Sequence, residues 1–378
     1  MLRILAMAIA GAVLLAVPAA QAAPKKSPRH VKVMTRNIYL GGDIVRPIAG
    51  TAGCPDPATC FDRFARANHG LREIVDRTKF PARAKLLAEE IATRKPDLVG
   101  LQEVATWRRG PMETTPSPSP TATEVELDFL EILMGALEDA GQRYRVVRVQ
   151  EQADIEGPAY APDGSDQRDV RLTIHDVILR RVKKNLRVVR SGGDNFDASL
   201  GLTAAGIPVT VLRGHVWADV RLGKKRFRFI NTHLESFLSN VARNQARELL
   251  KGPAKGRRAT VMVGDFNSDP LDGSVKPYDI PHWSAYRLIA RKFTDGWDSL
   301  RNTNDPGWTA GLSETVDDAD TSSIDHRIDM IFTRGEKRGK KKRKRIKAQR
   351  GWTTGTENRS PEGLWASDHA GVVLRLKL

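Results

Sequence analysis

The sequence predicts one large α/β domain, because short apolar strands alternate along it with amphipathic helices. A chain of 378 residues could form one large domain or two ordinary ones, but no stretch between the first and last strands resembles an interdomain linker. Many of these strands also end in polar residues, at the position where α/β proteins place reactive groups. We therefore expect a single α/β core with a site at its strand ends.

The first half of the chain predicts two strands and two helices. A strand over 31–36 ends at Asn37, and a helix from Pro81 to Pro96 carries its apolar residues on one face. A buried strand over 97–103 then ends in a carboxylate, and a second amphipathic helix ends at Gly141.

The second half predicts mainly strands, with one clear helix over 241–250. The strands are expected over 144–149, 176–180, 215–222, 226–231, 261–264, 327–332 and 372–376. Three further segments predict loop insertions in the domain of residues 24–378. Residues 44–80 have no strong period, 111–123 are low in complexity and rich in Pro, and 334–347 are strongly basic.

Residues 1–23 predict a secretory signal peptide. Arg3 is followed by an apolar run over 4–17, and Ala20-Gln21-Ala22 fits a small-x-small cleavage signal. The run is short for a membrane span, and no later stretch is apolar enough to cross a bilayer. We expect an exported, soluble protein that is a monomer.

Two cysteines, Cys54 and Cys60, enclose five residues. In an oxidising compartment they could form a short-range disulfide, although two free thiols are the alternative.

The formal net charge of +16 is concentrated in one segment. Residues 334–347 hold ten Lys or Arg and one Glu, and the run from Lys337 to Arg345 is the densest part. Such a run is either a solvated loop or a surface that captures a polyanion, which could be DNA, RNA or an anionic membrane.

The strand over 261–264 leads directly into Asp265 and Asn267, two residues apart. Residues two apart on an extended backbone point the same way, so these side chains can reach one centre. A carboxylate beside an amide donor suits a phosphate oxyanion, whereas the same residues also suit an Asx turn. Similar polar residues follow the other apolar strands, namely Asn37, Glu103, His233, Asp368 and His369.

Six short motifs occur along the chain in this order: Met34-Thr35-Arg36-Asn37, Leu101-Gln102-Glu103-Val104, Asn231-Thr232-His233-Leu234, Gly264-Asp265-Phe266-Asn267, Arg327-Ile328-Asp329-Met330-Ile331 and Ser367-Asp368-His369. In type and order they resemble the endonuclease/exonuclease/phosphatase superfamily. This superfamily includes pancreatic-type deoxyribonucleases, abasic-site endonucleases, neutral sphingomyelinases and inositol-polyphosphate phosphatases. The opening Asn-Ile-Tyr-Leu-Gly-Gly-Asp resembles an exported bacterial branch.

The resemblance implies a four-layer sandwich, in which two stacked, mostly antiparallel β-sheets carry helices on their outer faces. It also implies hydrolysis of a phosphate ester with a divalent cation, most often Mg²⁺, with Mn²⁺ or Ca²⁺ as alternatives. Glu103 would hold the cation together with Asn37 and Asp368, because hard cations prefer oxygen ligands. Such an ion polarises a phosphoryl oxygen and offsets charge on the leaving group.

The resemblance also implies catalytic roles. Asp265 would orient or deprotonate the attacking water, while Asn37 and Asn267 would contact the substrate phosphate. His369 would contact the phosphate with Asp329 as its carboxylate partner, since a carboxylate inside an apolar strand needs one. His233 would protonate the leaving oxygen.

A further acidic residue often precedes the middle strand in this family. Here we expect it to be Asp176, in contact with the substrate phosphate.

Four functions are compatible with these residues. We expect a secreted metal-dependent nuclease, because export and the basic run favour a nucleic-acid substrate. The alternatives are a sphingomyelinase-type lipid phosphodiesterase, a phosphomonoesterase on inositol or sugar phosphates, and a non-enzymatic binding protein on the same scaffold.

Overall fold

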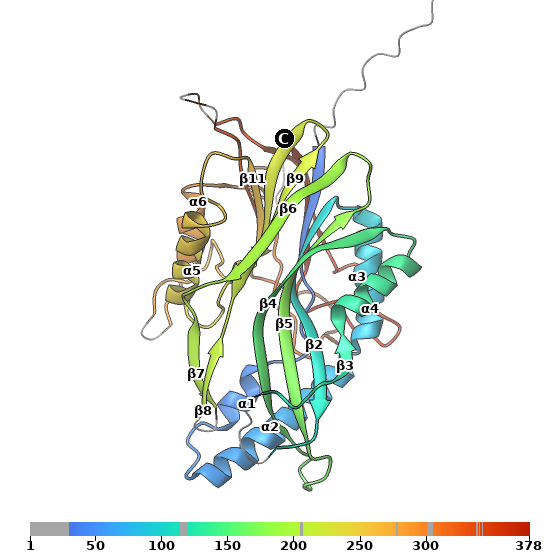
Figure 1. Cartoon of the computed structure of the whole chain (residues 1–378), viewed down its shortest axis with the longest axis vertical. Helices are drawn as coiled ribbons and strands as arrows, with labels where there is room; N and C mark the ends of the chain where they lie inside the picture. The colour runs from blue at the N-terminus through green and yellow to red at the C-terminus, as the bar shows by residue number, and fades with distance from the viewer. Residues whose placement is uncertain are drawn as a thin grey trace, which may run out of the picture.

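The structure is a computed structural model that describes residues 30–113, 119–204, 207–276, 279–300, 305–337, 339, 341 and 343–378. Two β-sheets pack face to face, and helices cover their outer faces (Figure 1). The expected four-layer sandwich is therefore confirmed. The expected signal peptide, residues 1–23, lies outside the described residues, as do residues 114–118 of the low-complexity segment.

The first sheet has seven strands in the order β14-β15-β1-β2-β5-β4, and β3 pairs with β2 outside this path. Its strands are β1 (His30–Asn37), β2 (Leu98–Gly110), β3 (Glu124–Asp128), β4 (Tyr144–Ala159), β5 (Arg168–Arg181), β14 (Lys347–Thr354) and β15 (Gly371–Lys377).

The second sheet has six strands in the order β12-β13-β11-β10-β9-β6, and β7 pairs with β8 in a separate hairpin. These strands are β6 (Leu186–Asn195), β7 (Leu200–Ala204), β8 (Ile207–Val211), β9 (Gly214–Leu222), β10 (Lys225–His233), β11 (Thr260–Asp265), β12 (Thr294–Asp295) and β13 (Asp329–Arg334).

Two strand pairs are parallel, β1 with β2 and β10 with β11, and the other described pairs are antiparallel. A β-strand that is buried on both faces reads as a continuous apolar run, as β11 does. The two sheets bury a shared core that includes Val33, Ile178, Phe229 and Val263. This arrangement directs the carboxyl ends of β1, β10 and β11 toward one region of the molecule.

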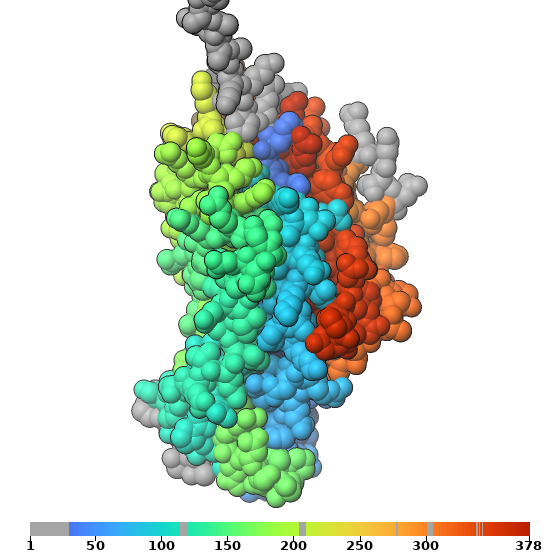
Figure 2. Space-filling view, turned by 90° about the vertical axis from the view of Figure 1, so that its right-hand side faces the viewer, coloured from blue at the N-terminus to red at the C-terminus, as the bar shows by residue number. Residues whose placement is uncertain are grey.

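Six helices cover the sheets in the part of the chain that is described. Three lie over the first sheet: α2 (Pro57–Arg77), α3 (Phe80–Arg94) and α4 (Phe129–Asp139). The short helix α1 (Val45–Gly50) packs against α2 and β7. The other two, α5 (Ser239–Lys251) and α6 (Ser284–Ala290), lie over the second sheet. Figure 2 shows the blue and cyan N-terminal helices directly beside the red C-terminal segment.

The expectation of a loop over 44–80 was wrong, because α1 and α2 occupy most of this segment. Asp56 caps α2 by accepting a hydrogen bond from the Thr59 N–H, and Pro57 lies in the first turn. The helix buries Asn68 and Arg72 together with Leu71. Because polar residues occupy part of its buried face, the helix lacks the regular spacing of apolar residues that predicts an amphipathic helix.

Cys54 and Cys60 form a disulfide with a Cα–Cα distance of 5.4 Å, just ahead of and within the first turn of α2. The strands expected over 144–149 and 176–180 are parts of much longer strands, β4 and β5. β4 carries many exposed, polar residues, whereas the first half of β5 buries polar residues such as Asp169 and Thr173 among its apolar ones, so neither strand shows a clear apolar alternation over its full length. No described helix combines the length and the hydropathy that crossing a membrane requires.

Candidate active site

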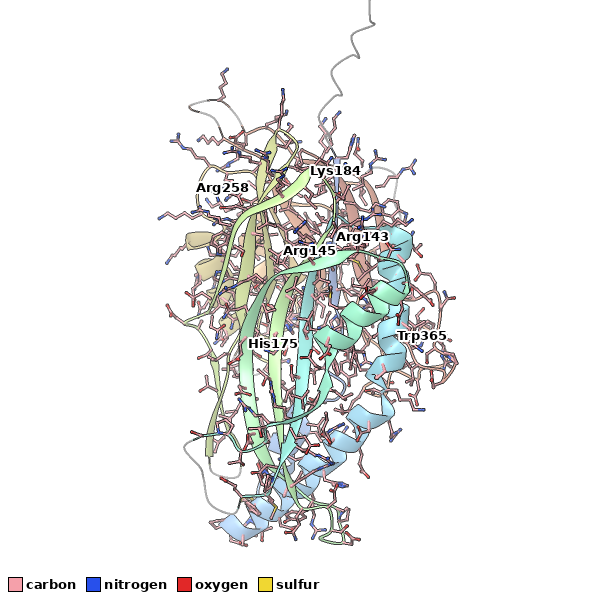
Figure 3. The ribbon with its side chains drawn as sticks, turned by 45° about the vertical axis from the view of Figure 1, so that its right-hand side comes forward. Arg143, Arg145, His175, Lys184, Arg258 and Trp365 are labelled. Carbon is pink, nitrogen blue, oxygen red and sulfur yellow. A yellow bond between two sulfur atoms is a disulfide. The ribbon has the colours of Figure 1, made fainter. Side chains whose placement is uncertain are left out.

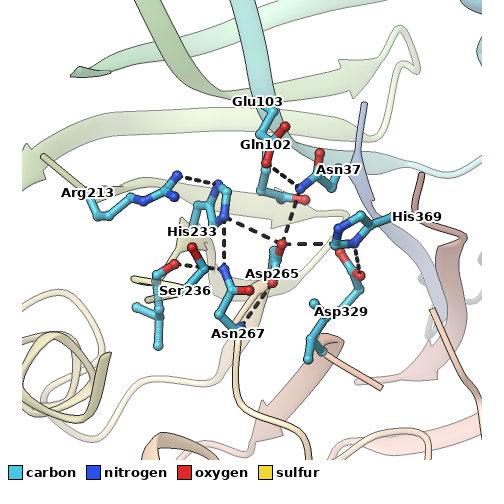
Figure 4. Close-up of polar contacts among 12 residues, drawn as sticks. Asn37, Gln102, Glu103, Arg213, His233, Ser236, Asp265, Asn267, Asp329 and His369 are labelled. Carbon is cyan, nitrogen blue, oxygen red and sulfur yellow. Dashed lines mark hydrogen bonds and ion pairs between the residues drawn. The ribbon is translucent and has the colours of Figure 1, made fainter. Parts of the chain in front are cut away.

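The strand register brings three predicted site residues side by side in the second sheet. His233 is the direct partner of Asp265 across the parallel β10–β11 pair, and Asp265 is the direct partner of Asp329 across the antiparallel β11–β13 pair. Neighbouring strands lie about 4.8 Å apart, so their side chains share one region. Asp265 is therefore the central residue of the cluster (Figure 4).

Asp265 is held by hydrogen bonds on both carboxylate oxygens. Its Oδ2 accepts from Asn37 Nδ2 at 3.2 Å, and its Oδ1 accepts from the backbone N–H of Asn267 at 3.0 Å. Burial, followed by the nearby charge of Asp329, raises the pKa of Asp265 to about 7. A carboxyl group with a pKa near neutrality is suited to act as a general base.

Gly264 explains why this carboxylate can lie so close to the neighbouring strand. Its φ is +156°, and a Cβ at this position would lie 2.1 Å from the carbonyl oxygen of Thr232. Any side chain would separate β10 from β11 at the level of the site.

Glu103 lies inside a strand, so the expectation that its strand ends there was wrong. β2 continues to Gly110, and its register with β5 shifts between Leu101 and Val104. Glu103 has a φ of +57°, which turns its side chain out of the pleat. The carboxylate then accepts hydrogen bonds from Asn37 Nδ2 and the Leu40 N–H, both at 3.0 Å.

Asn37 links Glu103 to Asp265 through its single amide nitrogen. Both side-chain N–H groups are therefore used within the protein, and Oδ1 accepts from the Tyr39 N–H at 2.9 Å. The expectation that Asn37 donates to a substrate phosphate does not agree with this geometry. Asn37 instead orients the two carboxylates, and its oxygen keeps a lone pair for a cation.

His369 and Asp329 form the expected pair. His369 Nδ1 donates to Asp329 Oδ2 at 2.7 Å, and it lies 3.9 Å from Asp265 Oδ2. Burial disfavours the imidazolium, but Asp329, Asp368 and Asp265 outweigh burial and raise the pKa of His369 well above its ordinary value. The ring is therefore a cation at neutral pH and attracts a phosphate.

Glu103 and Asp368 provide hard oxygen donors that fit a divalent cation. Burial, and then the charge of Glu103, raise the pKa of Asp368 to about 6, while His369 opposes this shift. A cation between these carboxylates would offset both effects, and Asn37 Oδ1 would complete the donor set. Donor atoms of Asp265, Asp329 and His369 also lie within 4.8 Å of one another, but His369 Nδ1 is already bonded to Asp329.

His233 lies between Arg213 and Asp265. Its Nδ1 is 3.1 Å from Arg213 Nη1, and its Nε2 is 3.5 Å from Asp265 Oδ2 and 3.1 Å from Asn267 Nδ2. A neutral imidazole has one acceptor nitrogen, but a donor group faces each ring nitrogen here, Arg213 at Nδ1 and Asn267 at Nε2. The hydrogen bond from the charged guanidinium is the stronger of the two, so Nδ1 is the acceptor. We therefore place the ring proton on Nε2, toward Asp265.

The surroundings of His233 favour a neutral ring. Burial, and then the charges of Arg213 and His369, lower its pKa well below the ordinary value. As a neutral ring, His233 would donate a hydrogen bond from Nε2 to a leaving oxygen. Asn267 lies beside this nitrogen on a left-handed backbone, with a φ of +43°, and its Nδ2 donates to the Leu234 carbonyl at 2.9 Å.

Asp176 is close to the cluster, and its expected contact with the substrate phosphate stays a prediction. It lies in the middle of β5 with a fully buried side chain. Burial, and then the charges of Asp265 and Glu103, raise its pKa well above the ordinary value, against the attraction of Arg213. The raised pKa favours the neutral form of this carboxyl group beside the site.

Sequence reasoning missed two buried arginines. Arg213 precedes β9 and carries no motif, so only its position beside His233 reveals it. Arg83 on α3 donates to the backbone carbonyls of Ile38, Tyr39 and Ala366, at 2.9, 3.1 and 3.0 Å. It thereby ties the loop after Asn37 to the segment before Asp368.

The fold and these residues define a class of metal-assisted phosphoric ester hydrolases, in which carboxylates and histidines converge between two stacked sheets. The sequence profile of the Endonuclease/Exonuclease/phosphatase family matches residues 68–369. The chain belongs to this family and is a phosphoric ester hydrolase. Enzymes of this family depend on a divalent metal. No curated protein matches the chain at the significance required of a relative.

Solved structures share the fold at low sequence identity. The mannosyl-6-phosphatase Bt3783 of Bacteroides thetaiotaomicron has 15% identity and a TM-score of 0.54, with 92% of this chain and all of that chain covered. The D. rerio TDP2 structure complexed with single-strand DNA product has 14% identity and a TM-score of 0.51, with 93% and 100% covered. An endonuclease/exonuclease/phosphatase from Beutenbergia cavernae has 19% identity and a TM-score of 0.51, with 93% and 72% covered.

Proposed function

We propose that this protein is an exported, divalent-metal-dependent phosphodiesterase that hydrolyses nucleic acid. The observation that carries the chemistry is the position of Asp265, which lies between neutral His233 on one side and the His369–Asp329 pair on the other. Attack of water on a phosphodiester requires a base, a neutral hydrogen-bond donor and a cationic donor around one point.

Each residue would have a distinct part in the reaction. Asp265 accepts a proton from the attacking water, and His369 donates to a non-bridging oxygen of the phosphate. Asn267 orients the same phosphate, and His233 donates from Nε2 to the leaving oxygen. Asn37 and Asp329 hold Asp265 and His369 in place.

A divalent cation would be held by Glu103, Asp368 and Asn37. When bound, it would polarise the phosphoryl group and offset the charge that develops on the leaving oxygen. These donors are all oxygens, which favours Mg²⁺, with Mn²⁺ and Ca²⁺ as alternatives.

Two observations support a nucleic-acid substrate. The protein has a formal net charge of +16, which favours a polyanion. A structure with the same fold, from D. rerio, is a complex with single-strand DNA product. Export is supported by residues 1–23 and by the Cys54–Cys60 disulfide, since disulfides persist in oxidising compartments.

A lipid phosphodiester is the second candidate, favoured by an apolar pocket between α1, α2 and the β7–β8 hairpin. Trp107 and Phe237 line this pocket, and Trp107 donates to the Leu40 carbonyl at 2.9 Å. Leu40 in turn donates to Glu103, so the pocket lies next to the expected metal ligand. Its volume of about 50 Å³ is small for an acyl chain, which makes this candidate the weaker one.

One assay separates these substrates. Purified protein is incubated with plasmid DNA, RNA, sphingomyelin and a soluble phosphomonoester, each with Mg²⁺ and with EDTA. We expect Mg²⁺-dependent cleavage of DNA or RNA. Turnover of sphingomyelin or of the monoester alone would replace the proposed substrate while leaving the phosphoesterase assignment intact.

A further inference from the structure

Among the described residues, a group of Lys and Arg side chains lies at the end of the second sheet that is opposite to the site. β13 begins at Asp329 in the site and ends at Arg334, where the basic segment 334–347 starts. β10 runs in the other direction, from Lys225 at the basic end to His233. Arg258 and Lys184 lie in the same upper part of the molecule in Figure 3, while His175 lies nearer its middle.

Two neighbouring grooves lie at this end, and Lys and Arg contribute to the lining of both. The first has a volume of about 610 Å³, between the β9–β10 turn and the segment after β13. Its charged lining residues are Lys224, Lys225, Arg226, Glu336, Lys341, Lys344 and Arg345. The second groove shares Arg345 with the first and adds Lys347 and Lys377.

These cations are available to a partner. Lys224, Arg226, Lys344 and Arg345 are exposed, and no carboxylate in the described ranges forms an ion pair with any of them. By contrast, the largely buried Arg228 nearby forms an ion pair with Asp219. A group of unneutralised cations around a concave surface attracts a polyanion.

The lining favours the phosphate backbone of a nucleic acid over a membrane. No aromatic residue lines either groove, so nothing in the described lining would insert into a bilayer or stack on a base. A concave surface also fits a chain-like polyanion better than it fits the flat surface of a membrane. Contacts from Lys and Arg to phosphates alone give affinity without sequence preference.

The rim of the site does not supply this affinity. The segment after Ala310, which pairs with His369, contains Glu314, Asp317, Asp318, Asp320 and Asp325 but no Lys or Arg up to His326. This acidic segment repels a long nucleic acid, so charge attraction beside it depends on His369 and a bound cation.

We propose that the grooves form a second, non-catalytic contact for duplex nucleic acid, which anchors the substrate whose hydrolysis is proposed above. Lys225 and His233 are eight residues apart on β10, which corresponds to about 26 Å along the strand. Base pairs of duplex DNA are spaced about 3.4 Å apart, so roughly 8 bp span this distance. Only duplexes longer than this reach both the groove and the site.

The test compares binding of 6-, 12- and 24-bp duplexes by fluorescence anisotropy, with Asp265→Asn in every protein so that cleavage does not interfere. The groove variant combines Lys224→Ser, Arg226→Ser, Lys344→Ser and Arg345→Ser. We expect the parent to bind 24 bp at least tenfold more tightly than 6 bp, and the groove variant to lose this difference. The slope of log affinity against log salt should fall by about 3 to 4.

A matched control removes the same charge elsewhere, from exposed residues of α2, α3 and the turn between them: Arg63→Gln, Arg77→Gln, Lys79→Gln and Lys85→Gln. The control should keep the length dependence. The proposal would be overturned if the control lost as much duplex affinity as the groove variant, or if the groove variant bound as the parent does. It would also be overturned if the groove variant lost the same affinity for all three duplex lengths. Loss of binding to phosphatidylglycerol vesicles with unchanged duplex binding would also overturn it and would assign the grooves to a membrane.

Cleavage is measured separately, with the active protein and a small phosphodiester, bis(p-nitrophenyl) phosphate. The groove variant should hydrolyse it at the parental rate, because the substitutions lie far from the site. Length-dependent duplex binding without any DNA cleavage would support the grooves and refute the proposed nuclease. Cleavage of a phosphodiester without length-dependent binding would support the proposed phosphodiesterase and refute the role of the grooves.

Discussion

At the scale of single residues, the site depends on two buried groups whose protonation their neighbours control. Burial and the charge of Asp329 raise the pKa of Asp265 to about 7, whereas burial and the charge of Arg213 lower the pKa of His233. A change in either neighbour therefore alters the chemistry even when the neighbour does not touch the substrate.

Replacing Asp265 with Asn should abolish the general base and lower kcat/KM by a factor on the order of 10² to 10⁴. The same change should increase stability in EDTA at pH 8. The folded-state pKa is about 7 and the ordinary value is 3.8, so stability falls as pH rises between these values, and the ionised group is a cost above pH 7. We expect a Tm at least about 2 °C above the parent at pH 8 and little difference at pH 4.

Asp139→Asn on the exposed face of α4 provides the control, and it should change neither activity nor Tm. A fully active Asp265→Asn protein would refute the assigned role, and a lower Tm at pH 8 would refute the electrostatic argument.

Replacing Arg213 with Gln should raise the pKa of His233 toward its ordinary value of 6.5, because the cation beside Nδ1 is removed. NMR titration of the His233 ring in EDTA measures this shift directly. Arg213→Lys keeps the charge and should leave the pKa low. The same titration curve in all three proteins would mean that Arg213 does not control the charge of His233.

At the scale of elements, the pairing of β10 with β11 sets the distance from His233 to Asp265. Gly264→Ala places a Cβ 2.1 Å from the Thr232 carbonyl on a backbone with positive φ. We expect a loss of about 3 kcal/mol in the free energy of unfolding, measured by urea denaturation. Activity of the remaining folded protein should fall as well, because the two strands separate at the site.

Gly70→Ala in α2 tests whether this effect is specific to the strand. A Cβ at Gly70 meets no atom within 4 Å, and the residue is helical. This change should stabilise the protein by about 0.5 to 1 kcal/mol. Equal destabilisation by both substitutions would contradict the steric argument.

At the scale of the whole molecule, a divalent cation should stabilise the fold, because Glu103 and Asp368 come from segments far apart in the sequence. Mg²⁺ at about 100 times its Kd should add about 2.7 kcal/mol to the free energy of unfolding. Differential scanning calorimetry with Mg²⁺ and with EDTA measures the shift. Glu103→Gln should abolish the shift together with the activity, and Glu138→Gln on exposed α4 should preserve both. A shift that persists in Glu103→Gln would place the cation elsewhere.

Several elements were predictable because they carry a regular pattern. β11 and β15 show apolar runs, β1 and β10 alternate apolar with polar residues, and α3 and α5 show a clear helical face. α2 was missed because it buries Asn68, His69 and Arg72 among its apolar residues. The continuation of β2 past Glu103 was missed because a bulge, rather than a turn, exposes that carboxylate.

The sequence by itself determined the family, the two-sheet fold and the types of residue that converge in the site, because these depend on local patterns and on motifs in order. Only the tertiary structure decided which roles the residues can take. In the folded protein, the side-chain amide of Asn37 donates to Glu103 and Asp265. Asp176 is fully buried, and Arg213 contacts the ring of His233. Hydrogen-bond partners, burial and charge at these positions come from segments distant in the chain, and no local pattern records them.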